Sequence, residues 1–276
     1  MKLLVILLTS TIALLASVIE VTTSIVPQKY FIEKIAKDKV LVNVMVKQGF
    51  SPAIYEPRTS QMKRLMNSKA YFAIGVPFEN VWLDKFSSIN KSMIVVDTSK
   101  NIKKLEMINH EHHDENEDEH DRKHDNHEEH EEHDEKNETH THQGGLDPHI
   151  WLDPILVKVQ AKNILDALIS LDKKNSAFYR KNYMDFINEL NVLDKNIQEI
   201  LKNNNNSAFM VFHPSWQYFA NRYNLEQIAV EKEGKEPKAK ELKNLIHEAH
   251  EHNIKVVFVA PQFSRKAAQT IAKSID

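Results

Sequence analysis

Hydrophobic and polar positions follow two alternating patterns along the first part of this chain. Short apolar runs, rich in Val and Ile or in aromatic residues, predict strands over residues 18–26, 40–46, 70–74 and 93–96. The amphipathic stretches between them predict helices over residues 28–36, 58–67 and 80–86. Because strands that alternate with helices form a parallel sheet covered on both faces, these residues are predicted to form an α/β lobe.

The middle of the chain contains the longest periodic segment. After a helix predicted over residues 154–171, a longer one is predicted over 176–202, where apolar side chains recur at steps of three and four: Tyr179, Tyr183, Phe186, Leu190, Leu193, Ile197 and Ile200. At 1.5 Å per residue this helix would be ~40 Å long. That length is suited to bracing two lobes.

A second α/β series follows the long helix. Strands are predicted over residues 208–212, 227–230 and 255–259, and helices over 215–223, 238–252 and 264–273. The fold class predicted is therefore two Rossmann-like parallel-sheet lobes joined by one long helix. No strand follows the last helix, so we expect the C-terminal lobe to be incomplete, through a truncated gene or an incomplete sequence. The predicted boundaries are a signal at 1–17, an N-terminal lobe at 18–172 with a loop at 106–145, a bridging helix at 173–206 and a C-terminal lobe at 207–276.

The N-terminus and the absence of cysteine indicate an exported protein. Lys2 precedes an apolar run over residues 3–15 that is shorter than the ~20 residues needed to span a bilayer, as in a secretory signal. An uncleaved anchor stays open, because the small pair Ala16-Ser17 is not a clean cleavage site. Without cysteine there are no disulfides, thiolate metal sites or Cys nucleophiles. A metal would have to be bound by His, Asp and Glu.

The composition of one segment indicates metal chemistry. Ten of the fifteen histidines lie within residues 110–142, where fifteen acidic side chains stand against three basic ones. The net charge of −3 therefore hides an acidic insert in a basic body. Acidic runs of low complexity are ordinarily disordered, and we expect this of the insert. Imidazoles among carboxylates nevertheless offer many weak sites for divalent transition metals, zinc first.

Two histidines outside the insert stand where parallel α/β lobes bind ligands. His213 directly follows the strand predicted at 208–212, at the carboxyl edge of its sheet. His149 lies in a loop between Pro148 and Pro154, just before a helix. We expect one histidine from each side of a two-lobed cleft. Each taken alone is equally well interpreted as a hydrogen-bonded loop residue.

Three segments resemble the signature segments of one family. D-P-H-I-W-L-D-P at 147–154, V-F-H-P-S-W-Q-Y-F at 211–219 and V-F-V-A-P-Q-F-S at 257–264 are similar to those of ZnuA-like zinc-binding solute-binding proteins of ABC importers. The resemblance implies two α/β lobes with metal bound between them, and His149 and His213 as metal ligands. It also implies a periplasmic, monomeric receptor whose transported ligand is Zn²⁺ and whose partners are an ABC permease and its cytoplasmic ATPase. Imidazole at position 213 favours zinc, since Mn²⁺ prefers oxygen.

Two departures from the family pattern leave the ligand set open. In G-F-S-P-A-I-Y-E-P at 49–57, Ala53 occupies the position of the family's first ligand histidine. A fourth family ligand, a late aspartate, would fall beyond Asp276. Two imidazoles fill half of a tetrahedral zinc shell, so water or further side chains must complete it.

Candidates for the remaining positions are weaker. His140 and His142 are the insert histidines nearest in sequence to His149. Glu231, at the end of the strand at 227–230, is a further candidate, although a surface carboxylate is its more ordinary interpretation. The carboxylates of Asp147 and Asp153 could instead hold the His149 imidazole through hydrogen bonds. His247, His250 and His252 lie at a predicted helix end, where a structural role through the helix dipole is expected.

The function predicted is therefore zinc capture and delivery to an ABC importer, without catalysis. A periplasmic zinc buffer or chaperone remains an alternative, as does a receptor for another divalent metal such as Mn²⁺ or for a metal–chelator complex. A metallohydrolase is disfavoured, because the sequence contains no H-E-x-x-H, G-x-S-x-G or phosphate-loop motif. No Arg-rich patch is interleaved with aromatic residues, so nucleic acid is not an expected partner.

Overall fold

The computed structural model describes residues 18–107, 145–204, 207–231 and 235–275. Their contacts divide them into two compact units. Unit 1 contains the described residues up to Ile102 together with Asp153–Ile200, and unit 2 contains those of Lys103–Leu152 and from Leu201 onward. The signal predicted at 1–17 and nearly all of the loop predicted at 106–145 lie outside the described residues.

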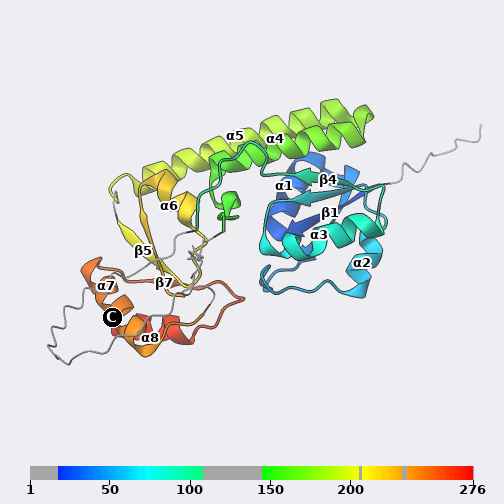
Figure 1. Cartoon of the computed structure of the whole chain (residues 1–276). Helices are drawn as coiled ribbons and strands as arrows, with labels where there is room; N and C mark the ends of the chain where they lie inside the picture. The colour runs from blue at the N-terminus through cyan, green and yellow to red at the C-terminus, as the bar shows by residue number, and fades with distance from the viewer. Residues whose placement is uncertain (1–17, 108–144, 205–206, 232–234, 276) are drawn as a thin grey trace, which may run out of the picture. The chain divides into compact units, whose positions relative to one another are not determined.

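Unit 1 is built on a four-stranded parallel sheet in the order β2-β1-β3-β4 (Figure 1). Its strands are β1 Ile19–Ile25, β2 Val40–Val46, β3 Ala70–Ala73 and β4 Ile94–Asp97. Ile19 is paired with Val40, and Val21 with Ala70, so all four strands begin near one edge of the sheet. The β-branched runs thus form the parallel sheet that their pattern predicted.

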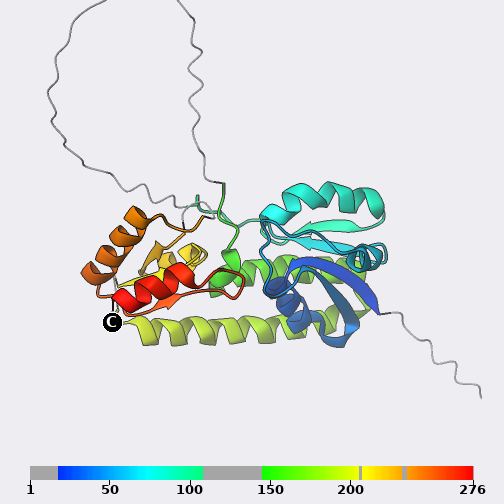
Figure 2. The ribbon, with the colours of Figure 1, turned by 90° about the horizontal axis from the view of Figure 1, so that it is seen from below.

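Helices cover both faces of this sheet. They are α1 Val26–Ala36, α2 Thr59–Leu65, α3 Pro77–Ile89, α4 Pro154–Leu171 and α5 Ser176–Leu201. In Figure 2, α3 lies on one side of the sheet, and α1 and α4 lie on the other. Phe31, Ile32 and Ile35 of α1 are buried as predicted. Proline occupies the first turn of α1, α3 and α4, where its missing N–H costs no helical hydrogen bond.

The long helix predicted at 176–202 is confirmed as α5, with 26 residues. Its apolar stripe is buried only in the N-terminal half, at Tyr179, Phe186 and Leu190. Leu193 and Ile200, farther along the same stripe, are exposed. Packing against α1 accounts for the buried half, where Phe186 stacks at 5.9 Å from Phe31.

Unit 2 contains a three-stranded parallel sheet in the order β6-β5-β7. Its elements are β5 Ala208–Val211, α6 Gln217–Tyr223, β6 Glu226–Ala229, α7 Ala239–Glu251, β7 Val257–Phe258 and α8 Lys266–Ser274. Its core joins strand residues such as Met210 and Ile228 to Leu245 of α7 and Ile271 of α8. Two parallel sheets with intervening helices confirm the predicted fold class.

The segment around His149 belongs to unit 2, which corrects the N-terminal lobe predicted at 18–172. Tyr218 Oη accepts a hydrogen bond from Leu105 N at 2.9 Å and donates one to Asp147 O at 2.8 Å. Gln217 Nε2 donates to Glu106 O at 3.1 Å. These bonds connect residues more than 70 positions apart, so the local periodicity that set the predicted boundary carried no information on them.

Residues 105–107 and 145–147 pair in antiparallel fashion. Asp147 N donates to Leu105 O at 2.8 Å, and Met107 N donates to Gly145 O at 3.1 Å. Met107 and Gly145, which flank residues 108–144 in the sequence, are therefore joined by a short pairing that includes Asp147.

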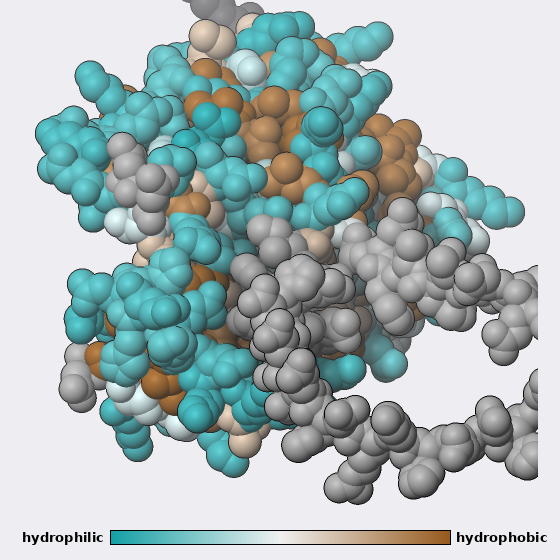
Figure 3. All heavy atoms as spheres, turned by 60° about the vertical axis from the view of Figure 1, so that its left-hand side comes forward, coloured by the Kyte–Doolittle hydropathy of each residue, from teal (hydrophilic) through white to brown (hydrophobic). Residues whose placement is uncertain are grey.

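No helix in the part of the chain that the structure describes is both long and apolar enough to cross a bilayer. In Figure 3, hydrophilic residues dominate the coloured part of the face seen, with smaller apolar patches between them.

Candidate metal site

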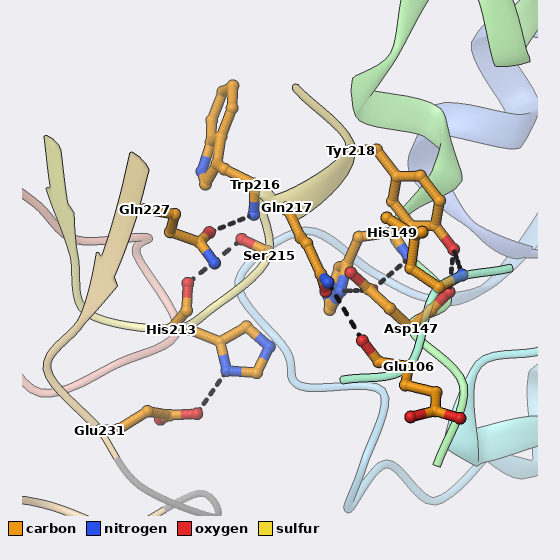
Figure 4. Close-up of polar contacts among 11 residues, drawn as sticks. Glu106, Asp147, His149, His213, Ser215, Trp216, Gln217, Tyr218, Gln227 and Glu231 are labelled. Carbon is orange, nitrogen blue, oxygen red and sulfur yellow. Dashed lines mark hydrogen bonds and ion pairs between the residues drawn. The ribbon is translucent and has the colours of Figure 1, made fainter. Parts of the chain in front are cut away.

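His213 and Glu231 lie side by side at the carboxyl edge of the unit 2 sheet (Figure 4). His213 comes two residues after β5 ends, and Glu231 two residues after β6 ends. Glu231 N donates to Phe212 O at 2.9 Å, so the ladder continues past β6 and keeps residue 231 inside the fold. The carboxylate of Glu231 is hydrogen-bonded to Nδ1 of His213, and the residue is only 6% exposed. The interpretation of Glu231 as a surface carboxylate is therefore wrong.

His149 is held by its own loop. Asp147 Oδ1 accepts from the backbone N–H of His149 at 2.9 Å and contacts His149 Nδ1 at 2.6 Å. Trp151 packs 5.0 Å from the imidazole, measured between ring centroids. Because Tyr218 binds Asp147 O, the loop is attached to α6. The hydrogen bond with Asp147 and the contact with Trp151 therefore hold the His149 imidazole in one orientation without a bound ligand.

The two imidazoles face each other within unit 2. Their ring centroids are 5.3 Å apart, with the ring planes at 72°. Phe263 stacks on His213 at 4.8 Å, with the planes at 24°. We expected one histidine from each lobe, whereas hydrogen bonds to α6 accompany the grouping of the His149 loop with His213 in unit 2.

The carboxylate partners determine which ring nitrogen can bind a metal. A carboxylate only accepts hydrogen bonds, so Nδ1 of each imidazole must be the donor, which leaves a lone pair on each Nε2. If one Zn²⁺ joined the two Nε2 atoms at about 2.1 Å in tetrahedral geometry, the ring centroids would lie roughly 5.4 Å apart, since each nitrogen is about 1.2 Å from its centroid. The measured 5.3 Å agrees with that spacing.

The surroundings of the pair carry buried negative charge. Asp147 is fully buried, and its Oδ2 has no hydrogen-bond partner among the residues that the structure describes. Burial raises the pKa of Tyr218 to about 12, and the Asp147 charge acts in the same direction against the hydrogen bond from Leu105 N. Tyr218 therefore remains a neutral donor at physiological pH. A buried carboxylate beside each imidazole favours a cation between the rings.

The other predicted site residues lie elsewhere. Asp153 Oδ1 accepts from Ile155 N at 2.7 Å and Leu156 N at 3.3 Å, as the N-cap of α4 in unit 1. Ala53 is exposed in a turn of unit 1. His140 and His142 fall outside the described residues. Within those that are described, no group of three or more His, Asp or Glu is close enough to hold a metal ion.

The three histidines near the end of α7 are on the surface. His247 Nε2 lies 3.3 Å from Glu251 Oε1 and His252 Nδ1 lies 3.8 Å from Glu226 Oε2, in exposed pairs. His250 is exposed in the last turn of the helix. Their positions suit the structural role predicted from the helix dipole.

Sequence reasoning did not assign roles to Tyr218 and Phe263. Both stand in the segments that carried the resemblance, five residues after His213 and five after Phe258 respectively. Their positions a few residues after predicted strands could have identified them as residues near the site, because side chains at the carboxyl edge of a parallel sheet converge.

Comparisons with known proteins agree with this arrangement. A family profile described as "ZnuA: Zinc-uptake complex component A periplasmic" matches residues 21–276. The high-affinity zinc uptake system protein ZnuA of Bacillus subtilis (strain 168) is 30% identical over 264 residues, which cover 93% of this chain and 75% of that protein. Zinc-binding protein AdcA of Streptococcus pyogenes is 28% identical over 259 residues, covering 92% of this chain and 48% of AdcA.

Solved structures give the same assignment. A crystal structure of ZnuA matches with a TM-score of 0.78 and 39% identity, covering 93% of this chain and 88% of that one. A deletion mutant of ZnuA with zinc bound matches with a TM-score of 0.77 and the same identity, covering 93% and 86%. Because the family profile matches nearly the whole length of this chain, the chain belongs to the family of ZnuA, the periplasmic component A of zinc-uptake complexes.

Proposed function

We propose that this protein is a periplasmic receptor that captures Zn²⁺ and delivers it to an ABC-type importer for high-affinity zinc uptake. The observation that carries the proposal is the His149–His213 pair, whose rings lie 5.3 Å apart with each Nδ1 hydrogen-bonded to a buried carboxylate. The names of its relatives support the transport role, and the family's periplasmic assignment supports the location. Binding and release without catalysis are sufficient for this role.

The donor set favours zinc over manganese. Both proposed ligands are neutral nitrogens, which suit Zn²⁺, whereas Mn²⁺ prefers oxygen donors. Asp147 and Glu231 fix the imidazole orientation and raise the basicity of Nε2, as carboxylates do in many zinc sites. Their two negative charges also balance the charge of a divalent cation without direct coordination.

The histidine-rich insert completes the proposed site. It leaves the fold at Met107 and returns at Gly145, which are hydrogen-bonded to each other close to Asp147. His140 and His142 precede Gly145 by a few residues, and an extended chain spans about 3.5 Å per residue, so either could reach the His149 imidazole. We propose them as the additional ligands, with the other insert histidines collecting zinc at weak, exchanging sites.

Calorimetric titration of the full chain tests the metal assignment. We expect one tight Zn²⁺ site above several weak ones, with Mn²⁺ bound at least tenfold more weakly than Zn²⁺ at the tight site. Equal or tighter Mn²⁺ binding would contradict the zinc receptor and favour a manganese receptor. Only weak sites, with none tight, would favour a zinc buffer.

Replacing Glu231 with glutamine should weaken the tight site by about 10- to 100-fold, because loss of the charged partner lowers the basicity of the His213 imidazole. The matched control is Glu251→Gln, which removes the carboxylate of an exposed His–Glu pair on α7. Zinc titration of both variants at the same pH makes the comparison. Equal affinities in the two variants would mean that Glu231 does not support the site.

A further inference from the structure

Basic side chains gather at the amino edge of the unit 1 sheet. Lys39 directly precedes β2, Lys69 directly precedes β3, and Lys91 lies three residues before β4. All three are exposed. Because the strands are parallel and in register, these lysines lie along one edge of the same sheet.

A hollow at this edge brings in residues from the α4–α5 connection. Its volume is about 590 Å³, and its lining includes Val18, Lys39, Lys173 and Lys174. Two acidic residues, Asp38 and Asp172, are also in the lining.

Asp172 is hydrogen-bonded to side chains that follow it in the chain. Asp172 Oδ2 accepts from Asn175 Nδ2 at 2.5 Å and from Tyr179 Oη at 2.9 Å. Burial by itself would raise the pKa of Asp172, but these hydrogen bonds and the positive charge of Lys174 outweigh it and hold the pKa below its usual value. Asp38 is the exposed acidic side chain of the hollow, and its Oδ2 lies 3.8 Å from Lys39 Nζ in a solvent-exposed ion pair.

A second cluster adjoins the hollow through β1 and β3. Asn90 Nδ2 donates to the carbonyls of Leu65, Met66 and Ser68 at 2.9, 3.1 and 2.9 Å, which ties the ends of α2 and α3 together. Lys69 N donates to Glu20 O at 2.8 Å, which joins the cluster to β1. Lys69 and Lys91 thereby belong to the same sheet edge as the hollow, and Arg64 lies in the last turn of α2, next to Leu65. We call the following residues the basic edge: Lys39, Arg64, Lys69, Lys91, Lys173 and Lys174.

Exposed apolar side chains stand among these charges. Val18 is 54% exposed, Met66 60% and Ile89 47%. Favourable interaction with helix dipoles accounts for basic residues at the ends of α2 and α4. It does not account for lysines that precede strands, nor for exposed aliphatic side chains between them.

We propose that the basic edge docks this protein on an anionic phospholipid surface. Clustered basic side chains are attracted to anionic headgroups, and aliphatic side chains among them insert at the interface. This inference is independent of the zinc site.

Vesicle flotation with the full chain tests the proposal. We expect phosphatidylcholine vesicles containing about 30% phosphatidylglycerol to bind at least tenfold more tightly than pure phosphatidylcholine vesicles, with the difference lost at high salt. Pure phosphatidylcholine reports any binding that is due to residues 1–17. The test variant is Lys39→Glu with Lys69→Glu and Lys91→Glu. Its matched control, with the same change in net charge, is Lys47→Glu with Lys100→Glu and Lys195→Glu, all exposed outside the basic edge.

In the test variant, the ratio of affinity for anionic vesicles to affinity for pure phosphatidylcholine vesicles should fall by roughly 100-fold, at about fivefold per basic side chain. In the control variant, the same ratio should change by less than about threefold. Equal losses in the two variants, or no preference for anionic vesicles at all, would overturn the proposal. Should the triple variant fail to fold, Lys173→Glu with Lys174→Glu in the exposed α4–α5 connection replaces it.

Met66→Ser with Ile89→Ser should weaken binding to anionic vesicles but not to soluble polyglutamate. Equal weakening of both would assign a polyanion site instead of a membrane surface.

Discussion

Replacing His213 with alanine should weaken zinc binding at the tight site by roughly a hundredfold or more. The change removes a proposed ligand, so its effect should exceed the 10- to 100-fold typical of changes in the residues that support a ligand. It also leaves the Glu231 carboxylate buried without the imidazole to which it is hydrogen-bonded. His149→Ala should have a similar effect, because it leaves Asp147 Oδ1 without the ring N–H.

Competition titration with a chelator of known zinc affinity measures these losses. His250→Ala is the matched control, since it removes an exposed imidazole on α7 in the same unit. Thermal unfolding of each apoprotein separates loss of a ligand from loss of the fold. If both site variants retained the affinity of the His250 variant, the two histidines would be removed from the proposed zinc site.

Replacing His140 and His142 together with alanine should weaken the tight site by tenfold or more. Two imidazoles fill half of a tetrahedral zinc shell, and a water molecule in place of a third imidazole lowers affinity. The described part of the chain has no cluster of three or more ligands that could supply the difference. Because the described residues supply only two of the proposed zinc ligands, we expect the tight site to depend on histidines of the insert.

The control for this prediction is His124→Ala with His127→Ala, which removes the same number of imidazoles from the middle of the insert, farthest in sequence from both Met107 and Gly145. Calorimetry should show the weak sites reduced in both double variants and the tight site weakened in one. A tight site unchanged in both would indicate that water or a ligand outside the insert completes the shell. A tight site weakened equally in both would indicate that no particular insert histidine is required.

The regular part of the fold could be predicted because its signals are local. Strands at 40–46 and helices at 154–171 were predicted with the boundaries of β2 and α4, since β-branched runs and helical periodicity act over a few residues. The strand predicted at 255–259 is shorter in the structure, as β7 Val257–Phe258. Only two of its residues pair with β5, namely Val257 and Phe258.

The surroundings of the site depended on contacts that no local pattern encodes. His149 and His213 could be singled out from their positions beside a strand end and a proline-held loop. The burial of Glu231 depends on a ladder that continues to Phe212, and the unit to which His149 belongs depends on Tyr218. Such contacts join residues far apart in sequence. Base rates for exposed carboxylates therefore gave the wrong interpretation of Glu231.

Because Met107 and Gly145 are hydrogen-bonded to each other, the length of the segment between them can change without moving the residues that follow Gly145. The free energy of closing a flexible loop grows only with the logarithm of its length, so a loop of twice the length would cost about 0.6 kcal/mol more. Asp147 and His149 are anchored to Tyr218 on the far side of that pairing. Insertions and deletions can therefore accumulate between Met107 and Gly145 while the two imidazoles keep their places. The number of histidines between Met107 and Gly145 can therefore change without altering the His149–His213 pair.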